Sequence, residues 1–251
     1  MATAHHSSTS PEGLHLVGRL VEASNATFLV EDSGGKKFVY KPVAGEAPLW
    51  DFPTGTLGRR EVAAYELSRA SGFDVVPSTT WIEGPLGEGS LQVWVEDSGP
   101  ELARLVPVDE VPGDWYGIVL GVDAHDREVA LIHADHPGLR RLALFDVLVN
   151  NADRKAGHIL RAGDAVFGCD HGVSFHVDHK LRTILWGWAG DPLTDAEIAL
   201  LRSVPGVSQV LEDWLDPPEM DALLTRCEAL LQAGIFPAPG DAWPVIPWPP
   251  I

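Results

Sequence analysis

The sequence is poor in cysteine and contains no long apolar run. Two cysteines, Cys169 and Cys227, occur in 251 residues. They are too few for a disulfide framework or a cysteine-rich zinc site, and they fit a reducing compartment, so we expect a cytoplasmic protein. No uninterrupted apolar stretch approaches the roughly 18–20 residues that a membrane span requires.

Basic residues are also scarce. The chain has 18 Lys and Arg residues against 36 Asp and Glu residues, which gives a formal net charge of −18. A broad phosphate-binding face is therefore disfavoured, and we expect neither nucleic acid nor a stable association with anionic membranes. Apolar residues make up 45% of the chain and charged residues 22%, which is the composition of a folded protein rather than a disordered one.

The first hundred residues have the pattern of an antiparallel sheet with one helix. Residues 1–13 lack the basic and apolar regions of a signal peptide, and we expect a flexible tail there. Apolar and polar residues alternate around two turn signals in the segment that follows. The predicted elements are three strands within 14–43, a helix over 59–71, and two more strands over 75–83 and 90–96. We assign residues 14–97 to one lobe.

The pattern changes toward helices after residue 97, with long irregular connections. Thr194 and Glu197 form a capping box, and the Asp-Pro-Pro at 216–218 starts the clearest helix. The predicted elements are helices over 137–149, 195–203, 208–215 and 216–233, and short strands over 159–161 and 165–169. We assign residues 98–235 to a second lobe. The proline-rich residues 236–251 are expected to lie extended across the surface.

Four features follow one another along the chain. They are a lysine that ends the third strand (Lys41), a glutamate early in the next helix (Glu61), Asn-Ala-Asp-Arg-Lys at 151–155, and Asp-His-Gly at 170–172. Each alone is weak. Together they provide what phosphoryl transfer from ATP requires: a lysine for the phosphates, a glutamate to hold it, a carboxylate for the acceptor and a carboxylate for the metal.

These motifs resemble those of proteins with the protein-kinase-like fold. Within it they resemble the atypical branch of phosphatidylinositol 3-/4-kinase-like and HipA-like enzymes, and more narrowly small actinobacterial proteins of the phosphatidylinositol-kinase-like type. The resemblance spans roughly residues 14–188. It implies an α+β, bilobal fold with a five-stranded antiparallel N-lobe that carries one helix, and a mainly helical C-lobe.

The resemblance also implies that ATP, with Mg or Mn, binds between the lobes. Lys41 is then expected on the phosphates with Glu61 as its partner, and Asp153 at the acceptor hydroxyl. Arg154 and Lys155 are expected to offset charge on the transferring group, and Asp170 and His158 to bind metal. The remaining nucleotide contacts that it implies are Ser24, Asn25 and Thr27 over the phosphates, and Val93, Trp94, Val95 and Glu96 beside the adenine.

His158 stands where the wider family has a metal-binding asparagine, and imidazole suits Mn²⁺ better than Mg²⁺. This departure leaves a nucleotide-binding pseudokinase module open as an alternative to a kinase. Two others stay open independently of it: an AMP transferase on the same fold, and a metal-dependent hydrolase. The last rests on the histidines at 133, 136, 171, 176 and 179. The acceptor is expected to be a soluble small molecule or a protein hydroxyl, since the acidity of the chain disfavours a lipid.

Overall fold

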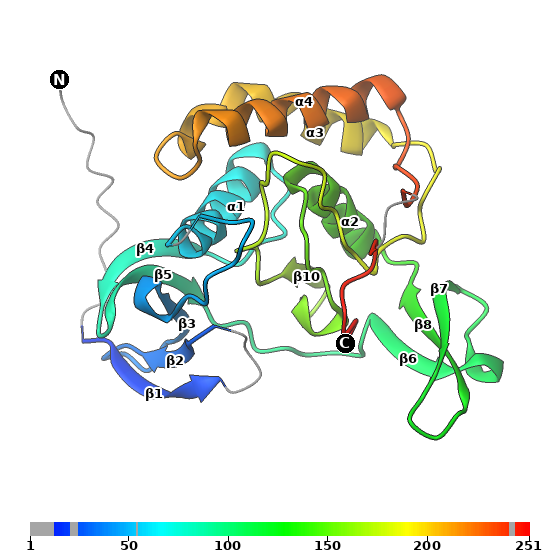
Figure 1. The fold of residues 1–251 in the computed structure, drawn as a ribbon, viewed down its shortest axis with the longest axis horizontal. Coiled ribbons are helices and arrows are strands. Elements are labelled where there is room, and N and C mark those ends of the chain that lie inside the picture. Colours follow the sequence, from blue (N-terminus) through cyan, green and yellow to red (C-terminus); the bar gives the residue numbers. More distant parts are fainter. Residues whose placement is uncertain (1–12, 21–24, 54, 241–243) are drawn as a thin grey trace.

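The computed structural model describes residues 13–20, 25–53, 55–240 and 244–251. Its N-terminal part is a five-stranded antiparallel sheet in the order β1-β2-β3-β5-β4, with one helix packed against it (Figure 1). The elements are β1 His15–Leu20, β2 Thr27–Glu31, β3 Lys37–Pro42, the 3-10 turn η1 Val43–Gly45, α1 Leu57–Ser71, β4 Thr79–Gly84 and β5 Gly87–Val93. This is the predicted set of five strands and one helix. The helix starts two residues before the predicted position.

Strand β3 directs its side chains to two different environments. Phe38 and Tyr40 are buried in a small cluster with Val30, Ile82 and Leu91. Because side chains alternate along a strand, Lys41 lies on the opposite face. Its partner in register is Ser90 on β5, and α1 packs along β4 and β5. The lysine therefore lies on the face of the sheet that carries the helix.

Within the described residues, the C-terminal part contains three α-helices besides short 3-10 turns. Its elements are β6 Ala103–Pro107, the 3-10 turn η2 Val108–Glu110, β7 Trp115–Val122, β8 Glu128–Ala134, α2 Pro137–Val149, the 3-10 turn η3 Ala156–His158, β9 Ile159–Ala162, β10 Ala165–Gly168, α3 Asp195–Val207, the 3-10 turn η4 Ser208–Leu211 and α4 Pro217–Ala233. The fold is thus the bilobal α+β arrangement that was predicted. None of the helices in the described ranges is long and apolar enough to cross a membrane.

A three-stranded antiparallel sheet, ordered β6-β8-β7, is an addition that the sequence reading did not contain. In the sequence it lies after the linker that follows β5 and before helix α2. In the structure it projects from the second lobe (Figure 1). Four consecutive residues of the central strand β8, Ala130 to His133, are buried. A strand covered on both faces lacks the alternation by which strands are recognised, so its pattern is weak.

Two helix predictions need correction. The predicted helix over 208–215 is only the 3-10 turn η4, and α3 continues past residue 203 to Val207 with Pro205 inside it. Proline cannot donate to the carbonyl four residues earlier, which is that of Leu201. The thiol of Cys227 donates to this oxygen instead, at 3.1 Å. A contact from α4 therefore satisfies the carbonyl that Pro205 leaves free.

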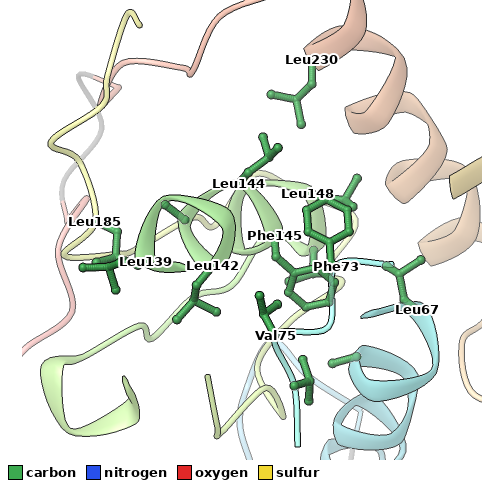
Figure 2. Packing of buried hydrophobic residues seen from close by; sticks show 14 of the residues in the cluster. Leu67, Phe73, Val75, Leu139, Leu142, Leu144, Phe145, Leu148, Leu185 and Leu230 are labelled. Carbon is green, nitrogen blue, oxygen red and sulfur yellow. The ribbon is translucent and has the colours of Figure 1, made fainter. Parts of the chain in front are cut away.

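One large apolar core joins the two lobes. Figure 2 shows Leu67 of α1 and Phe73 and Val75 of the following loop packed against α2, around Leu142 and Phe145. These side chains are buried almost completely. Helices α3 and α4 cover the other side of α1 and α2 (Figure 1). The helix that carries Glu61 is therefore anchored to the second lobe, which fixes the position of its carboxylate.

Candidate active site

Lys41 joins two carboxylates from different parts of the fold. Its Nζ contacts Glu61 Oε1 of α1 and lies 2.7 Å from Asp170 Oδ1, which follows β10. Burial opposes the charge of Lys41, but Asp170 and Glu61 outweigh it and raise the pKa of the ammonium. The same lysine holds the pKa of Asp170 well below its ordinary value. Lys41 and Asp170 are therefore both ionised near neutral pH.

Glu61 is almost inaccessible, with 2% of its surface exposed. Its second oxygen, Oε2, accepts a hydrogen bond of 3.0 Å from the backbone N–H of His171. One carboxylate therefore fixes both the lysine of β3 and the loop that carries Asp170. A buried carboxylate with two donors, one of them charged, is the kind of contact that holds a constellation in place.

Three side chains at this site could hold a metal ion. Asp153, His158 and Asp170 each offer one ligand atom, and these atoms lie within 4.8 Å of one another. His158 Nδ1 lies 2.9 Å from the carbonyl oxygen of Asp153. A carbonyl can only accept, so Nδ1 carries the proton, and burial lowers the pKa of the ring so that it stays neutral. The other nitrogen, Nε2, is then an acceptor.

That nitrogen lies 3.4 Å from Asp170 Oδ2. Two acceptors at this separation repel each other unless a proton or a cation lies between them. The donor set, two carboxylates and one neutral imidazole, is one that binds Mg²⁺ or Mn²⁺, and the imidazole favours manganese. The residues present therefore fit the predicted divalent ion.

Asp153 is partly exposed beside this group. Its Oδ2 lies 3.1 Å from Lys155 Nζ, and its side chain is 34% exposed. Burial raises the pKa of Asp153, and Lys155 opposes this effect. The backbone N–H of Asp153 donates to Asn151 Oδ1 at 2.9 Å. A carboxylate of raised pKa at the edge of a charged cluster is suited to accept a proton.

Arg154 is not where the sequence expectation placed it. The side chain is completely buried and forms a two-pronged ion pair with Asp146 of α2, with Nε–Oδ2 at 2.8 Å and Nη2–Oδ1 at 2.9 Å. Its Nη1 also donates to the carbonyls of His158 and Cys169. The guanidinium therefore faces the interior, and the expectation that it offsets charge on a transferring group is replaced by a positioning role.

The sequence reading missed Asp146 and the role of the two asparagines after α2. Asn151 Nδ2 donates to Asp146 Oδ1 at 3.0 Å. Asn150, the C-cap of α2, donates to the carbonyls of His176 and Asp178 and accepts from Lys180 N. Its φ of 56° lies in the left-handed region that asparagine tolerates. A lone carboxylate in the otherwise apolar stretch 142–149 was the signal for Asp146.

The residues expected over the phosphates lie at the start of β2. Ser24 lies outside the described residues. Asn25 Oδ1 accepts from Ala47 N at 2.7 Å, so it braces the loop after β3. The Thr27 side chain is buried and its hydroxyl contacts the carbonyl of Asn25 at 3.4 Å. The Thr27 hydroxyl is therefore engaged within its own turn.

The residues expected beside the adenine lie at the end of β5 and directly after it. The backbone N–H groups of Val93 and Trp94 already donate to Ser78 O and Lys37 O, at 2.8 and 3.0 Å. Among the described residues, the backbone N–H groups of Val95 and Glu96 make no hydrogen bond. These two positions are the ones in the predicted segment that could still pair with a base.

The histidines behind the hydrolase alternative do not gather into one site. His133 is buried in the core, where Nε2 accepts from Gly187 N at 3.0 Å. His171 is buried against Arg154, and His176 Nε2 lies 3.0 Å from the carbonyl of Asp51. Within the described ranges, the group of metal-capable side chains is instead the one at Asp153, His158 and Asp170.

No family model matches the sequence. A curated protein of Mycobacterium tuberculosis (strain ATCC 25618 / H37Rv), Protein Rv2133c, is 43% identical over 258 residues, covering 94% of this chain and 91% of that protein. The chain belongs to the Rv2133c family. Lys41, Glu61, Asp153, His158 and Asp170 thus form the candidate site of a member of this family.

Solved structures are less similar to this chain than the Mycobacterium protein is. The Golgi casein kinase structure is 13% identical, with a TM-score of 0.48, over 90% of this chain and 73% of that one. The Helicobacter pylori proinflammatory kinase CtkA is 12% identical, with a TM-score of 0.46, over 88% of this chain and 92% of that one.

Proposed function

We propose that this protein is an ATP-dependent phosphotransferase of the atypical protein-kinase-like superfamily, which moves the γ-phosphate to a hydroxyl of a soluble small molecule or a protein. The observation that carries the proposal is the placement of Lys41 between Glu61 and Asp170, with Asp153 and His158 beside them. Phosphoryl transfer requires little covalent chemistry from a protein and depends on such positioned charges.

Lys41 would bind the α- and β-phosphates. In the structure it neutralises two carboxylates, and phosphate oxygens would take the place of Asp170 while the contact with Glu61 remains. Asp170 and His158, with Asp153 nearby, would hold Mg²⁺ or Mn²⁺. When bound, such an ion neutralises negative charge on the β- and γ-phosphates.

Asp153 would accept or orient the proton of the acceptor hydroxyl, and its raised pKa suits a base. Lys155, 3.1 Å from Asp153, would offset charge on the transferring phosphoryl group. Backbone N–H groups at Val95 and Glu96 would pair with the adenine. Arg154 would act through position, because it ties the loop at 153–158 to Asp146 and to the carbonyl that precedes Asp170.

A nucleotide-binding module without turnover is the second candidate. Two observations favour it: His158 replaces the expected asparagine, and the Thr27 hydroxyl contacts the carbonyl of Asn25 instead of facing the phosphates. Such a protein would still bind ATP through Lys41, Asp170 and the metal. Binding and phosphate transfer must therefore be measured separately.

The test compares variants in nucleotide binding and in γ-phosphate loss from radiolabelled ATP, with Mg²⁺ or Mn²⁺. We expect Lys41→Met and Asp170→Asn to abolish the thermal stabilisation by ATP and metal. Asp153→Asn should keep this stabilisation and lower turnover by about a hundredfold or more. The matched control is Asp221→Asn, on the exposed side of α4, which should behave as the wild type. Circular dichroism checks that each variant is folded.

Two outcomes decide between the candidates. Stabilisation of the wild type by ATP that depends on Lys41 and Asp170, without phosphate loss with either metal, favours the module. If ATP stabilises the wild type, Lys41→Met and Asp170→Asn equally, both candidates are wrong.

A further inference from the structure

A pocket separate from the Lys41 site lies at the junction of four segments. It has a volume of about 430 Å³, and its walls come from the linker after β5, from β6, from η3 and β9, and from Ile251. In Figure 1 this linker runs from the N-terminal sheet toward β6, past the β9–β10 hairpin and the end of the described chain. None of Lys41, Asp153 and Asp170 lines it.

The pocket nevertheless adjoins the candidate active site. Two of its lining residues, Ala156 and Gly157, belong to η3, and the third residue of this turn is His158. The ring of His158 lies against Asp153 O and Asp170 Oδ2. The Ala156 N–H donates to Pro250 O at 2.9 Å, which fixes the turn from its outer side. A molecule in the pocket would therefore contact the loop that carries the proposed base.

Two arginines line this pocket without a counter-ion. Within the described part of the chain, neither Arg104 nor Arg161 has a carboxylate oxygen within 4.0 Å of its guanidinium. The Nε atom of each is buried and makes no hydrogen bond. Arg104 stacks on Trp115, with its Cζ 4.8 Å from the ring centroid. In a chain with a net charge of −18, two such cations at one cavity indicate an anionic ligand.

The position of Arg161 depends on a glycine. Gly99 has φ of +123°, and a Cβ at that residue would lie 3.3 Å from Cζ of Arg161. The guanidinium is otherwise held by long contacts, from Nη1 to Pro100 O at 3.4 Å and from Nη2 to Gly163 O at 3.2 Å. Carbonyl contacts of this kind orient an arginine but leave its charge available to a ligand.

The same pocket also contains acceptors for hydroxyl groups. Asp97 and Glu101 line it. Asp97 Oδ1 accepts from Arg161 N at 2.8 Å, which leaves its second oxygen to accept elsewhere, and Glu101 is exposed. Carboxylates accept hydrogen bonds from hydroxyls, whereas guanidinium groups bind phosphate or carboxylate. The combination suits a molecule that has both.

We propose that this pocket binds the acceptor substrate, and that the acceptor is a small polyhydroxylated anion such as a sugar phosphate or a sugar acid. Arg104 and Arg161 bind its anionic group, and Asp97 and Glu101 bind its hydroxyls. The link from the pocket to Asp153 is the loop at 153–158, whose Ala156 and Gly157 line the pocket. The role as acceptor site rests on the proposed phosphotransferase function, whereas the anion site itself does not.

The test measures binding of glucose 6-phosphate, gluconate and neutral glucose by calorimetry at constant ionic strength. The variants are Arg104→Gln, Arg161→Gln and Gly99→Ala, with Arg141→Gln on the exposed face of α2 as the matched control. We expect at least one of the two anions to bind and glucose not to bind. Each pocket variant should raise Kd about tenfold, and the control should leave it unchanged. Preference for one anion identifies phosphate or carboxylate as the group that is recognised.

Further arms separate this proposal from the proposed function. The anion should still bind when ADP and Mn²⁺ are saturating, and should bind equally to Lys41→Met, whose nucleotide binding is lost. Arg104→Lys, which keeps the charge, should restore most of the affinity, which excludes misfolding as the cause of the loss. The proposal is overturned if neither anion binds, if the pocket variants bind as the wild type does, or if ADP competes with the anion, because the pocket would then belong to the nucleotide.

Discussion

Replacing Asp146 by asparagine should destabilise the protein strongly, although the residue lies at the back of the site. The substitution preserves the shape of the side chain and removes one charge. Asp146 accepts three hydrogen bonds, two from Arg154 at 2.8 and 2.9 Å and one from Asn151 at 3.0 Å. Both members of the ion pair are completely buried, so water cannot replace the lost carboxylate.

The magnitude follows from the environment that Arg154 keeps. Removing one partner of a buried ion pair costs about 3–5 kcal/mol, because the other charge remains in the interior. Adding three bonds to charged groups at about 1.5–3 kcal/mol each gives a larger value. Arg154 retains the carbonyls of His158 and Cys169 as acceptors, however, and the asparagine keeps one oxygen. We therefore expect a loss at the lower end, about 3 kcal/mol.

Urea unfolding measures this loss. With an m value of about 3 kcal/mol/M, the midpoint should fall by about 1 M. Asp221→Asn, on the exposed side of α4, should change the unfolding free energy by no more than about 0.5 kcal/mol. The double variant Asp146→Leu/Arg154→Met removes both charges and should cost less than Asp146→Asn alone. A midpoint for Asp146→Asn within error of the Asp221→Asn control would refute the reasoning, as would a double variant less stable than the single one.

Two further predictions concern buried titratable groups. Burial raises the pKa of the Cys227 thiol to about 11. In a Cys169→Ala background, iodoacetamide at pH 8 should therefore modify the folded protein about two hundredfold more slowly than the urea-unfolded chain. Rates within tenfold of each other would contradict this prediction. Burial lowers the pKa of His133 in the folded protein. Below about pH 6.5 the unfolded chain therefore binds the proton first, and the free energy of unfolding falls as the pH is lowered. The loss of unfolding free energy between pH 7 and 5 should therefore be smaller in His133→Gln than in the wild type, and equal losses in urea titrations would disprove it.

The sequence was most informative where local pattern and chemistry coincide. The alternation around Lys41 predicted its strand, and the capping box at Thr194 predicted the start of α3, which the structure confirms with both reciprocal bonds. These signals are local because they arise from neighbours two to four residues apart. The order of Lys41, Glu61, Asp153 and Asp170 along the chain predicted a shared site before any distance was known.

Only the tertiary structure decided which charged residues face the cleft and which face the core. Arg154 and Lys155 are adjacent and both positively charged, yet one is completely buried while the side chain of the other is 20% exposed beside Asp153. The difference is Asp146 on α2, eight residues before Arg154. Its carboxylate pairs with the guanidinium and offsets the free-energy cost of burying that charge. The same holds for Arg104 and Arg161, 57 positions apart in the numbering, which line one pocket because β6 and β9 meet there. Residue type and local spacing determine which chemistry a side chain can perform. Long-range packing determines what surrounds it, and the surroundings determine whether a charge is a structural clamp or a binding group.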